Sequence, residues 1–372
     1  NHSSMNTLKS ILFLVLAISF SIGLNAQKNK KSESKTELEK LSTSGLKFRC
    51  VGPAIASGRI ADMAVNPDNP FEYYVAVASG GVWKTVNAGT TYTPIFDSQG
   101  SYSIGCIVID PNDHNTIWVG SGENNNQRSV AYGDGVYKST DRGATWKNMG
   151  LKESERISDI IIHPENSDIV WVSVQGPLWT SGGERGLYKT TDGGETWKLA
   201  LEPPDEWTGV TSLLIDPRNP DKLYAATWSR QRLIASYVGT GQGAGIHTSD
   251  DGGETWTELK TGLPKGNMGK IGMAISPMNP DVLYATIETD NRKGGFYRSE
   301  NQGASWTNIT YNLGNMPIRN AVIDHTNNST IYLGTEIGVY KKTMAETTWS
   351  LYNIDLPNMS VRELAIMYGS NT

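Results

Sequence analysis

Acidic residues in the predicted loops of this chain could do acid–base chemistry, but no spacing selects a pair of them. Hydrolysis of a glycosidic bond needs two carboxylates on either side of that bond. The acids in suitable loops are Glu123, Glu184, Glu288, Asp290 and Glu336. We take Glu123, Glu288 and Asp290 as the catalytic candidates. Patterns typical of metalloproteases (HExxH), serine hydrolases (GxSxG) or phosphate-binding loops are absent from the sequence.

Arginines are the second group of residues that could bind a ligand. Arg59 and Arg156 each begin an apolar run that predicts a strand. Arg230 and Arg232 lie in the longest predicted loop. A cluster of guanidinium groups favours recognition of carboxylates through paired hydrogen bonds. We therefore predict that these four residues bind the ligand, together with Glu123.

Both the arginines and the nearby aromatic residues also have a structural interpretation. The two arginines that begin strands could instead pair with Asp62 and Asp159. Trp179, Trp228 and Tyr237 could stack on sugar rings or on peptide side chains. The two tryptophans could equally cap the edges of sheets. The sequence alone leaves these alternatives open.

The elements that would position these residues come from an internal repeat. The stretch STDRGATW (residues 139–146) returns as TTDGGETW (190–197), SDDGGETW (249–256) and SENQGASW (299–306). A variant, TVNAGTTY, occupies residues 85–92, and KTMAETTW occupies 342–349. The last aromatic residues of these six copies are 43 to 59 residues apart. Such a period indicates a solenoid or a propeller.

The eight-residue motif suits a tight turn between two strands. A short Asp or Asn side chain can bond to nearby backbone N–H groups, and Gly takes a positive φ. The motif resembles the Asp-box, or bacterial neuraminidase repeat, whose aspartate, glycine and tryptophan build a turn. Its residues here are Asp141, Gly143, Trp146, Asp192, Gly194, Trp197, Asp251, Gly253, Trp256, Asn301, Gly303 and Trp306.

The resemblance covers residues 46–372 and implies an all-β propeller of four-stranded antiparallel blades. Asp-box families include sialidases, xyloglucanases, sortilin-type receptors and photosystem assembly factors. This chain is most similar to the sortilin-like and xyloglucanase-like secreted bacterial proteins. We expect six complete blades and an incomplete seventh, which begins at residues 360–367 and uses residues 46–51 as its outer strand. Such a chain would be truncated at its C-terminus, with further domains possible beyond it.

Strand alternation places the predicted site. Loops after the second strand of each blade, and the connections between blades, share one rim, whereas the repeated turns follow the third strand and lie on the other rim. Long insertions follow the second strands, at residues 122–134, 175–185, 228–244 and 288–293. Because binding residues concentrate on variable loops of a rigid scaffold, we predict that this rim is the functional one.

The N-terminus and the composition bound the cellular setting. Residues 1–4 read as upstream sequence, residues 5–26 as a secretory signal peptide and residues 27–45 as a disordered leader. We predict a secreted, periplasmic or cell-surface bacterial protein. The net charge of −5 gives no basic footprint for nucleic acid, and nothing after the signal peptide predicts membrane insertion. Cys50 and Cys106 could form a disulfide, but they fall in different blades, so we expect two buried free thiols.

These features predict a binding protein, with no cofactor and no metal site. Its ligand would be a glycan or a peptide, held on the rim opposite the repeated turns, and the chain would be part of a larger cell-surface or hydrolase-like protein. The alternative is a glycoside hydrolase, xyloglucanase-like or sialidase-like, that uses carboxylates at the mouth of the channel.

Overall fold

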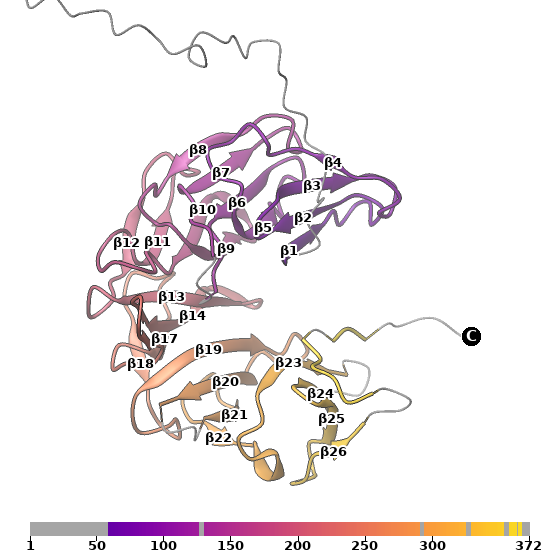
Figure 1. Cartoon of the computed structure of the whole chain (residues 1–372), viewed down its shortest axis with the longest axis vertical. Helices are drawn as coiled ribbons and strands as arrows, with labels where there is room; N and C mark the ends of the chain where they lie inside the picture. The colour runs from indigo at the N-terminus through magenta and orange to yellow at the C-terminus, as the bar shows by residue number, and fades with distance from the viewer. Residues whose placement is uncertain are drawn as a thin grey trace, which may run out of the picture. The chain divides into compact units, whose positions relative to one another are not determined.

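Six four-stranded antiparallel sheets form the body of the protein in a computed structural model of the chain (Figure 1). The structure describes residues 59–125, 130–290, 294–324, 329–352, 357–362 and 364–366, all within the compact unit Gly52–Thr372. The predicted signal peptide, leader and N-terminal outer strand, together with Cys50, lie outside the described residues. Residues 360–362 and 364–366 form no strand, so a seventh blade stays a prediction.

Each sheet runs through the chain in order, from its first strand to its fourth. The first three sheets contain β1 (Ile60–Val65), β2 (Tyr73–Val77), β3 (Gly81–Thr85) and β4 (Thr93–Pro94), then β5 (Ile104–Ile109), β6 (Ile117–Ser121), β7 (Val136–Ser139) and β8 (Lys147–Gly150), then β9 (Ile157–His163), β10 (Asn166–Val174), β11 (Gly186–Thr190) and β12 (Lys198–Leu201).

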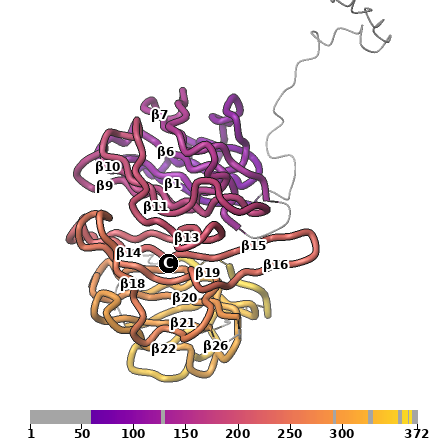
Figure 2. The backbone as a smooth tube through the Cα atoms, turned by 90° about the vertical axis from the view of Figure 1, so that its left-hand side faces the viewer, coloured from indigo at the N-terminus to yellow at the C-terminus, as the bar shows by residue number. Residues whose placement is uncertain are grey.

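The other three sheets repeat this plan, with one added hairpin. They contain β13 (Thr208–Asp216), β14 (Asn219–Ser229), β17 (Gly245–Ser249) and β18 (Thr257–Leu259), then β19 (Met268–Ile275), β20 (Leu283–Thr289), β21 (Gly295–Ser299) and β22 (Thr307–Asn308), then β23 (Ile318–Ile323), β24 (Thr330–Thr335), β25 (Gly338–Thr343) and β26 (Ser350–Leu351). The hairpin of β15 (Gln231–Arg232) and β16 (Tyr237–Val238) extends from the fourth sheet (Figure 2). One 3₁₀ turn, η1 (Tyr311–Leu313), precedes the sixth sheet.

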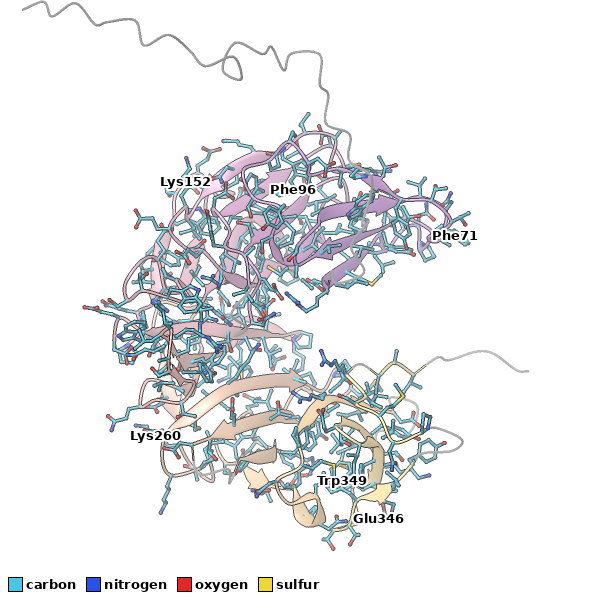
Figure 3. All side chains as sticks on the ribbon, viewed as in Figure 1. Phe71, Phe96, Lys152, Lys260, Glu346 and Trp349 are labelled. Atoms are coloured by element: carbon cyan, nitrogen blue, oxygen red, sulfur yellow. The ribbon has the colours of Figure 1, made fainter. Side chains whose placement is uncertain are left out.

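Consecutive sheets pack face to face through five apolar clusters, one at each boundary between two neighbours. Phe96 lies in the cluster between the first and second sheets, and Trp349 in the cluster between the fifth and sixth. In Figure 3 both rings point into the molecule, whereas Lys152 and Lys260 point outward. Four-stranded antiparallel sheets stacked in this way form a β-propeller, as the resemblance implied.

The first strands differ in burial, and one prediction about them is wrong. The apolar runs predict strands buried on both faces, and β5 fits this expectation, with all residues but Val108 buried. In contrast, Met63 and Val65 of β1 are exposed. Among the described residues, β1 packs against a neighbouring sheet only through its other face, which carries Ala64. Burial on both faces therefore requires a blade on each side.

The repeated turns make the same hydrogen bonds in sheet after sheet. In the second sheet, the Ser139 hydroxyl donates to Asp141 Oδ1 at 2.7 Å and accepts from the Gly143 N–H at 2.8 Å. Asp141 also accepts from the N–H and the hydroxyl of Thr145. These bonds lower the pKa of Asp141 to about 2. The Trp146 indole donates to the Ile95 carbonyl of the first sheet at 2.8 Å, so the turn also ties neighbouring sheets together.

The variant copies show which letters of the motif matter. In the first sheet, Asn87 accepts from Thr85 and from the Thr91 N–H, as the aspartate does elsewhere. Asn301 of the fifth sheet accepts from Ser299 and from the Ser305 N–H. An amide oxygen therefore replaces a carboxylate oxygen in this turn. The role of the motif in these sheets is structural.

Candidate functional site

The loops that follow second strands lie at the end of the sheets opposite the repeated turns. The turns contact the loops that follow first strands, as where the Arg142 N–H donates to the Asn115 carbonyl at 2.9 Å. The insertion loops instead contact the connections between sheets. The Gly122 N–H donates to the Ser103 carbonyl at 2.7 Å, and the Gly182 N–H to the Glu206 carbonyl at 3.0 Å. Antiparallel pairing therefore separates two rims, which we call the turn rim and the loop rim.

Arg59 and Glu123 meet on the loop rim. The guanidinium donates two hydrogen bonds to the carboxylate, at 2.5 and 2.6 Å. Glu123 is 3 % exposed and also accepts from the Asn125 side-chain amide, while its backbone N–H donates to the Ser103 hydroxyl. These contacts fix the position of the Glu123 carboxylate, and a catalytic role for it stays a prediction.

The segment that follows Glu123 joins the second sheet to three others. The Asn124 side chain donates to the Ser158 carbonyl of the third sheet at 3.2 Å. Its own carbonyl accepts from Lys270 of the fifth sheet at 3.4 Å. The Asn125 carbonyl accepts from Arg230, at the end of β14, at 3.1 Å. Residues far apart in sequence are therefore gathered around one short segment.

Four cationic side chains gather on the loop rim, on the third, fourth and fifth sheets, namely Arg156, Arg185, Arg230 and Lys270. Arg156 pairs with Glu155 at 2.5 Å. Arg185 donates five hydrogen bonds to backbone carbonyls of its own loop and of Trp207. Arg230 donates to the Asn125 and Gly176 carbonyls. Among the described residues, the last three of these cations have no carboxylate within ion-pair distance.

Burial and the repulsion between neighbouring positive charges lower the pKa values of these cations. Burial, followed by the charges of Arg156 and Arg185, lowers the pKa of Arg230 to about 9. Burial and the charge of Arg230 lower the pKa of Lys270 to about 8. Burial also lowers the pKa of Arg185, to about 10. The four side chains therefore form one positive region, and its charge is only partly compensated by the nearby acids.

The Trp228 ring contacts two of the cations in this region. Its ring is 3 % exposed, and its N–H donates to the Gly239 carbonyl at 2.8 Å. The Arg230 guanidinium lies 5.3 Å from the ring centroid and the Lys270 ammonium 5.6 Å. A ring covered in this way is not free to stack on a ligand, so that possible role of Trp228 is excluded. Trp179 is 40 % exposed, and its role as a stacking platform stays a prediction.

Arg232 lies on the hairpin of β15 and β16. Its guanidinium stacks 5.2 Å from the centroid of the Tyr237 ring, which is itself exposed. Tyr237 lies close enough to Arg230 for the charge of Arg230 to act on its pKa, so the hairpin borders the group of cations.

Asp62 and Asp159 lie on first strands, in β1 and β9. The sequence predicts for them only a role as ion-pair partners of the neighbouring arginines. Asp62 Oδ2 accepts from the Ile107 N–H of the second sheet at 3.0 Å, and Asp159 Oδ2 from the Leu213 N–H of the fourth sheet at 3.2 Å. Neither pairs with the arginine that starts its strand, so the ion-pair alternative is wrong for both. The repeated text Arg-Ile-x-Asp at residues 59–62 and 156–159 was the sequence signal.

The pKa values of these two carboxylates are raised. Burial raises the pKa of Asp159 to about 7, and the charge of Asp62 adds to this increase. Burial also raises the pKa of Asp62. Cys106 lies between them as a buried free thiol, and burial and the two carboxylates raise its pKa. A carboxylic acid that stays protonated near neutral pH can act as a proton donor.

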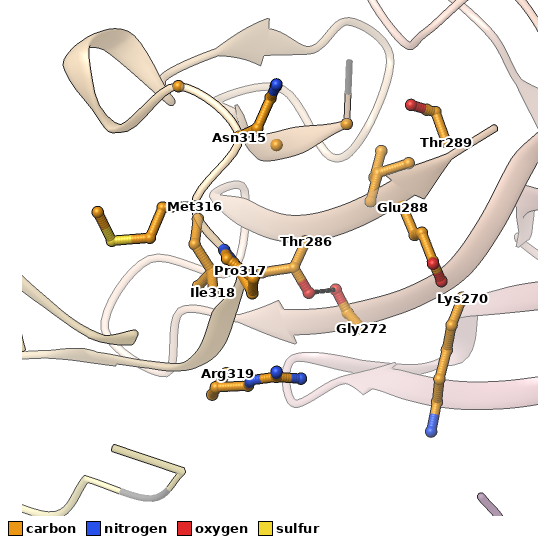
Figure 4. A pocket seen from close by; sticks show the side chains of 14 residues that line it. Lys270, Gly272, Thr286, Glu288, Thr289, Asn315, Met316, Pro317, Ile318 and Arg319 are labelled. Carbon is orange, nitrogen blue, oxygen red and sulfur yellow. Dashed lines mark hydrogen bonds between the residues drawn. The ribbon is translucent and has the colours of Figure 1, made fainter. Parts of the chain in front are cut away.

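A cavity of about 860 Å³ adjoins Lys270 (Figure 4). It lies between β19, the end of β20 and the connection that leads into β23, and its polar lining includes Lys270, Glu288 and Arg319. Ile287, Met316, Pro317 and Ile318 supply apolar surface. Its volume falls in the range of small-molecule sites.

The remaining candidate acids are spread over the loop rim. Glu288 is exposed and lines the cavity, whereas Asp290 is exposed but does not line it. Glu184 accepts from the Glu153 N–H at 2.8 Å. Glu336 pairs with Arg319 at 2.7 Å. These acids form no catalytic pair that the hydrogen bonds reveal.

Two further observations concern metals and membranes. No three His, Cys, Asp or Glu side chains in the described ranges gather as metal ligands would. Within the same ranges, no helix has the length and apolar character needed to cross a bilayer.

Comparison with known proteins gives matches to two groups of propeller proteins. A family model described as sortilin, neurotensin receptor 3, matches residues 134–266. A xyloglucanase of Paenibacillus sp is 26% identical over 267 residues, covering 64% of this chain and 24% of the relative. A xyloglucanase of Hypocrea jecorina is 25% identical over 292 residues, covering 68% and 32%. The chain thus spans about a quarter to a third of the length of these relatives.

Solved structures support the fold. The GH74 enzyme of Niastella koreensis superposes with a TM-score of 0.58 at 18% identity, covering 78% of this chain and 46% of that one. The YCF48 protein of Cyanidioschyzon merolae superposes with a TM-score of 0.53 at 15% identity, covering 81% and 87%. At these identities the two structures agree in architecture alone, and the shared architecture is the propeller.

Proposed function

We propose that this chain is a polysaccharide-directed propeller of the glycoside hydrolase kind, in which the loop rim holds the sugar chain. The observation that carries the proposal is the sequence similarity to xyloglucanases over about two thirds of the chain. The matched relatives are three to four times as long as the matching part, so the proposed hydrolysis belongs to the whole protein. Secretion is part of this proposal, because polysaccharides of this kind lie outside the cell.

The repeated turns are proposed to be Asp-boxes in the full sense, with a folding role. The Ser or Thr hydroxyl, the Asp or Asn side chain and the glycine N–H make the same bonds in five sheets. A residue repeated in five sheets is a poor candidate for a single catalytic centre. Any chemistry is therefore assigned to the loop rim and to the first strands.

Asp159 and Asp62 are the carboxylates that we assign to acid–base chemistry. First strands line the axis of a propeller, and both side chains are only partly buried. Asp159, whose pKa is raised to about 7 by burial, would donate a proton to the leaving oxygen, and Asp62 would act as the second carboxylate.

A binding role without hydrolysis is the second candidate. The sortilin-type match at residues 134–266 includes the loops that carry Trp179 and Arg230. Such a rim would bind a glycan or a peptide through the same charged residues. The two candidates share a location and differ in whether a bond is cleaved.

One experiment separates the candidates. The secreted protein is incubated with xyloglucan, other β-glucans and a peptide library, and both retention of ligand and release of reducing ends are measured. We expect retention of polysaccharide, and release of reducing ends that falls at least a hundredfold in Asp159→Asn. Retention without cleavage would favour the binding role. Retention of peptides alone would overturn the proposal.

A further inference from the structure

The cavity beside Lys270 has both a charged and an apolar lining, and the proposed function uses neither. Its charged lining consists of Lys270, Glu288 and Arg319, of which Arg319 pairs with Glu336 at 2.7 Å, and its apolar lining includes Met316 and Ile318. Sugar rings combine apolar faces with polar edges, so walls of both kinds are suited to a sugar. A neutral sugar, however, would gain nothing from the positive charge of Lys270.

Arg230 adds positive charge near Lys270. Its guanidinium lies 5.3 Å from the centroid of the Trp228 ring, which the Lys270 ammonium also contacts at 5.6 Å, and Arg230 is 1 % exposed. It uses two of its five N–H donors, both on backbone carbonyls. Arg185, 4 % exposed, is also bonded only to carbonyls. Carbonyl oxygens satisfy the N–H groups but leave the positive charge uncompensated.

Unsatisfied polar atoms lie next to these cations. Arg156 Nε and both side-chain amide atoms of Gln175 are buried without a hydrogen-bond partner. The two residues are neighbours, because the Gln175 N–H donates to the Arg156 carbonyl at 2.9 Å. Buried polar atoms in native proteins are almost always bonded, if not to protein then to water or a ligand. This part of the loop rim is thus built to receive polar atoms.

The acids nearby neutralise only part of this positive charge. Glu155 pairs with Arg156, Glu336 pairs with Arg319, and Glu123 pairs with Arg59 outside the group. Glu288 is exposed, and its charge opposes only partly the effect of burial on Lys270. Buried cations without a paired anion are costly, and an anionic ligand would remove that cost.

We propose that the cavity is a subsite for an acidic sugar residue, whose carboxylate binds at Lys270, near the uncompensated charge of Arg230. This inference rests on the proposed function and narrows it, because it makes the preferred polysaccharide a uronic acid polymer or a chain with uronic acid branches. The ring of the sugar would lie against Met316, Pro317 and Ile318. The amide of Gln175 and Arg156 Nε remain for water or for hydroxyl groups of the adjoining residue.

Calorimetric titration of the whole chain tests the proposal with matched saccharides. The probes are oligogalacturonate, the same oligomer with its carboxyls reduced to alcohols, and a xyloglucan oligosaccharide, each at low and moderate salt. We expect the acidic oligomer to bind at least tenfold more tightly than its reduced form, with a preference that shrinks as salt rises. Equal binding of the three would leave the proposed function standing and overturn the acidic subsite. Binding of none would instead defeat the proposed function.

Substitutions locate the effect. Lys270→Gln should lose the preference for the acidic oligomer by about tenfold while binding the reduced oligomer unchanged. Lys260→Gln is the matched control, because Lys260 is exposed and pairs only with Glu258. Glu288→Gln should act in the opposite direction and strengthen acidic binding about threefold, because it removes the negative charge from the cavity. Melting curves check that each variant is folded, and either Lys270→Gln or Glu288→Gln, measured beside the control, tests the proposal if the other is unstable.

Inorganic phosphate, added as a competitor, separates a sugar site from a simple anion site. Millimolar phosphate should displace the acidic oligomer only weakly if the sugar ring contributes. If phosphate binds as tightly as the oligomer, or if Lys270→Gln leaves the acidic preference intact, the assignment of a uronic acid to this cavity is wrong.

Discussion

The turn rim and the loop rim are opposite ends of the same sheets, yet their polar groups find their hydrogen-bond partners in different ways. On the turn rim, Asp141 has its hydrogen bonds supplied within eight residues, from Ser139 to Thr145. On the loop rim, Arg230 draws its partners from the second and third sheets. Local, complete networks stabilise a fold. A network that is assembled across sheets and leaves the side-chain amide of Gln175 without a hydrogen-bond partner is better explained by a ligand.

Cations stacked on tryptophan occur on both rims and make the contrast concrete. Lys138 lies 4.8 Å from the Trp118 ring and donates to the Gly193 carbonyl of the next turn. Arg230 lies 5.3 Å from the Trp228 ring and also donates to carbonyls. The Lys138 contact recurs at Lys189 and Trp171 of the third sheet, so it belongs to the repeat. The Arg230 contact occurs once, in the longest loop.

The largest expected effect is on stability, from the cores beneath the turn rim. Trp118 is fully buried and meets Trp197 edge to face. Trp118→Ala should lower the free energy of unfolding by about 3–5 kcal/mol, because it leaves a cavity between the second and third sheets. Chemical denaturation measures this. Ligand binding by the folded fraction should be unchanged, and a loss of affinity in folded protein would break the division between the rims.

The loop rim should respond in the opposite way. Arg230→Gln removes a buried charge that has no carboxylate partner among the described residues, so stability should change by less than about 1 kcal/mol or even rise. Affinity for the saccharide that the wild type retains should fall about 10- to 100-fold. Lys138→Gln is the matched control, with a modest loss of stability and no loss of affinity. If the two variants behave alike, the rims do not differ in function.

Much of this contrast could be predicted from the sequence, because the turns are local. The spacing of Ser139, Asp141 and Gly143 already implies the bonds that the structure contains, and strand alternation places the loops at the other end. The long apolar runs gave the first strands for the same reason. Local pattern thus accounts for the sheets and for the choice of rim.

The site itself depends on contacts that no local pattern encodes. Arg59 was matched with Asp62, three residues away, but it binds Glu123, which is 64 positions distant. Lys270 was not singled out, because a lysine inside a strand is ordinary until the Asn124 carbonyl and the Trp228 ring are seen beside it. For Trp228 the sequence leaves open a stacking role and a structural one, and only its burial in the folded protein decides between them. Partner identity across sheets is decided by the closed packing of the propeller.

The carboxylates on first strands give a test that depends on pH. The pKa of Asp159 is raised in the folded protein to about 7, above the ordinary value of an unfolded aspartate. Between about pH 4 and pH 7 the folded state therefore holds a proton that the unfolded state has lost, and stability falls as pH rises, by at most about 1.4 kcal/mol per pH unit. Asp159→Asn should remove this slope, as denaturation at several pH values would show. An unchanged slope would assign the effect to other groups.

The smallest expected effect comes from one repeated turn, and its sign is opposite to that of Asp159. Hydrogen bonds from Thr145 and Ser139 lower the pKa of Asp141 to about 2 in the folded protein. Its contribution is therefore fully present above about pH 4 and is lost as pH falls toward 2. Asp141→Ala should cost about 1 kcal/mol at neutral pH, the scale of a lost capping bond, and less in acid.

Asp141→Asn, which copies the turn at Asn301, should recover much of the loss because the amide oxygen still accepts from the Thr145 N–H. Denaturation of the three proteins at pH 7 and pH 3 measures this difference. Saccharide affinity should be the same in all three, and a change in affinity without a change in stability would place binding on the turn rim.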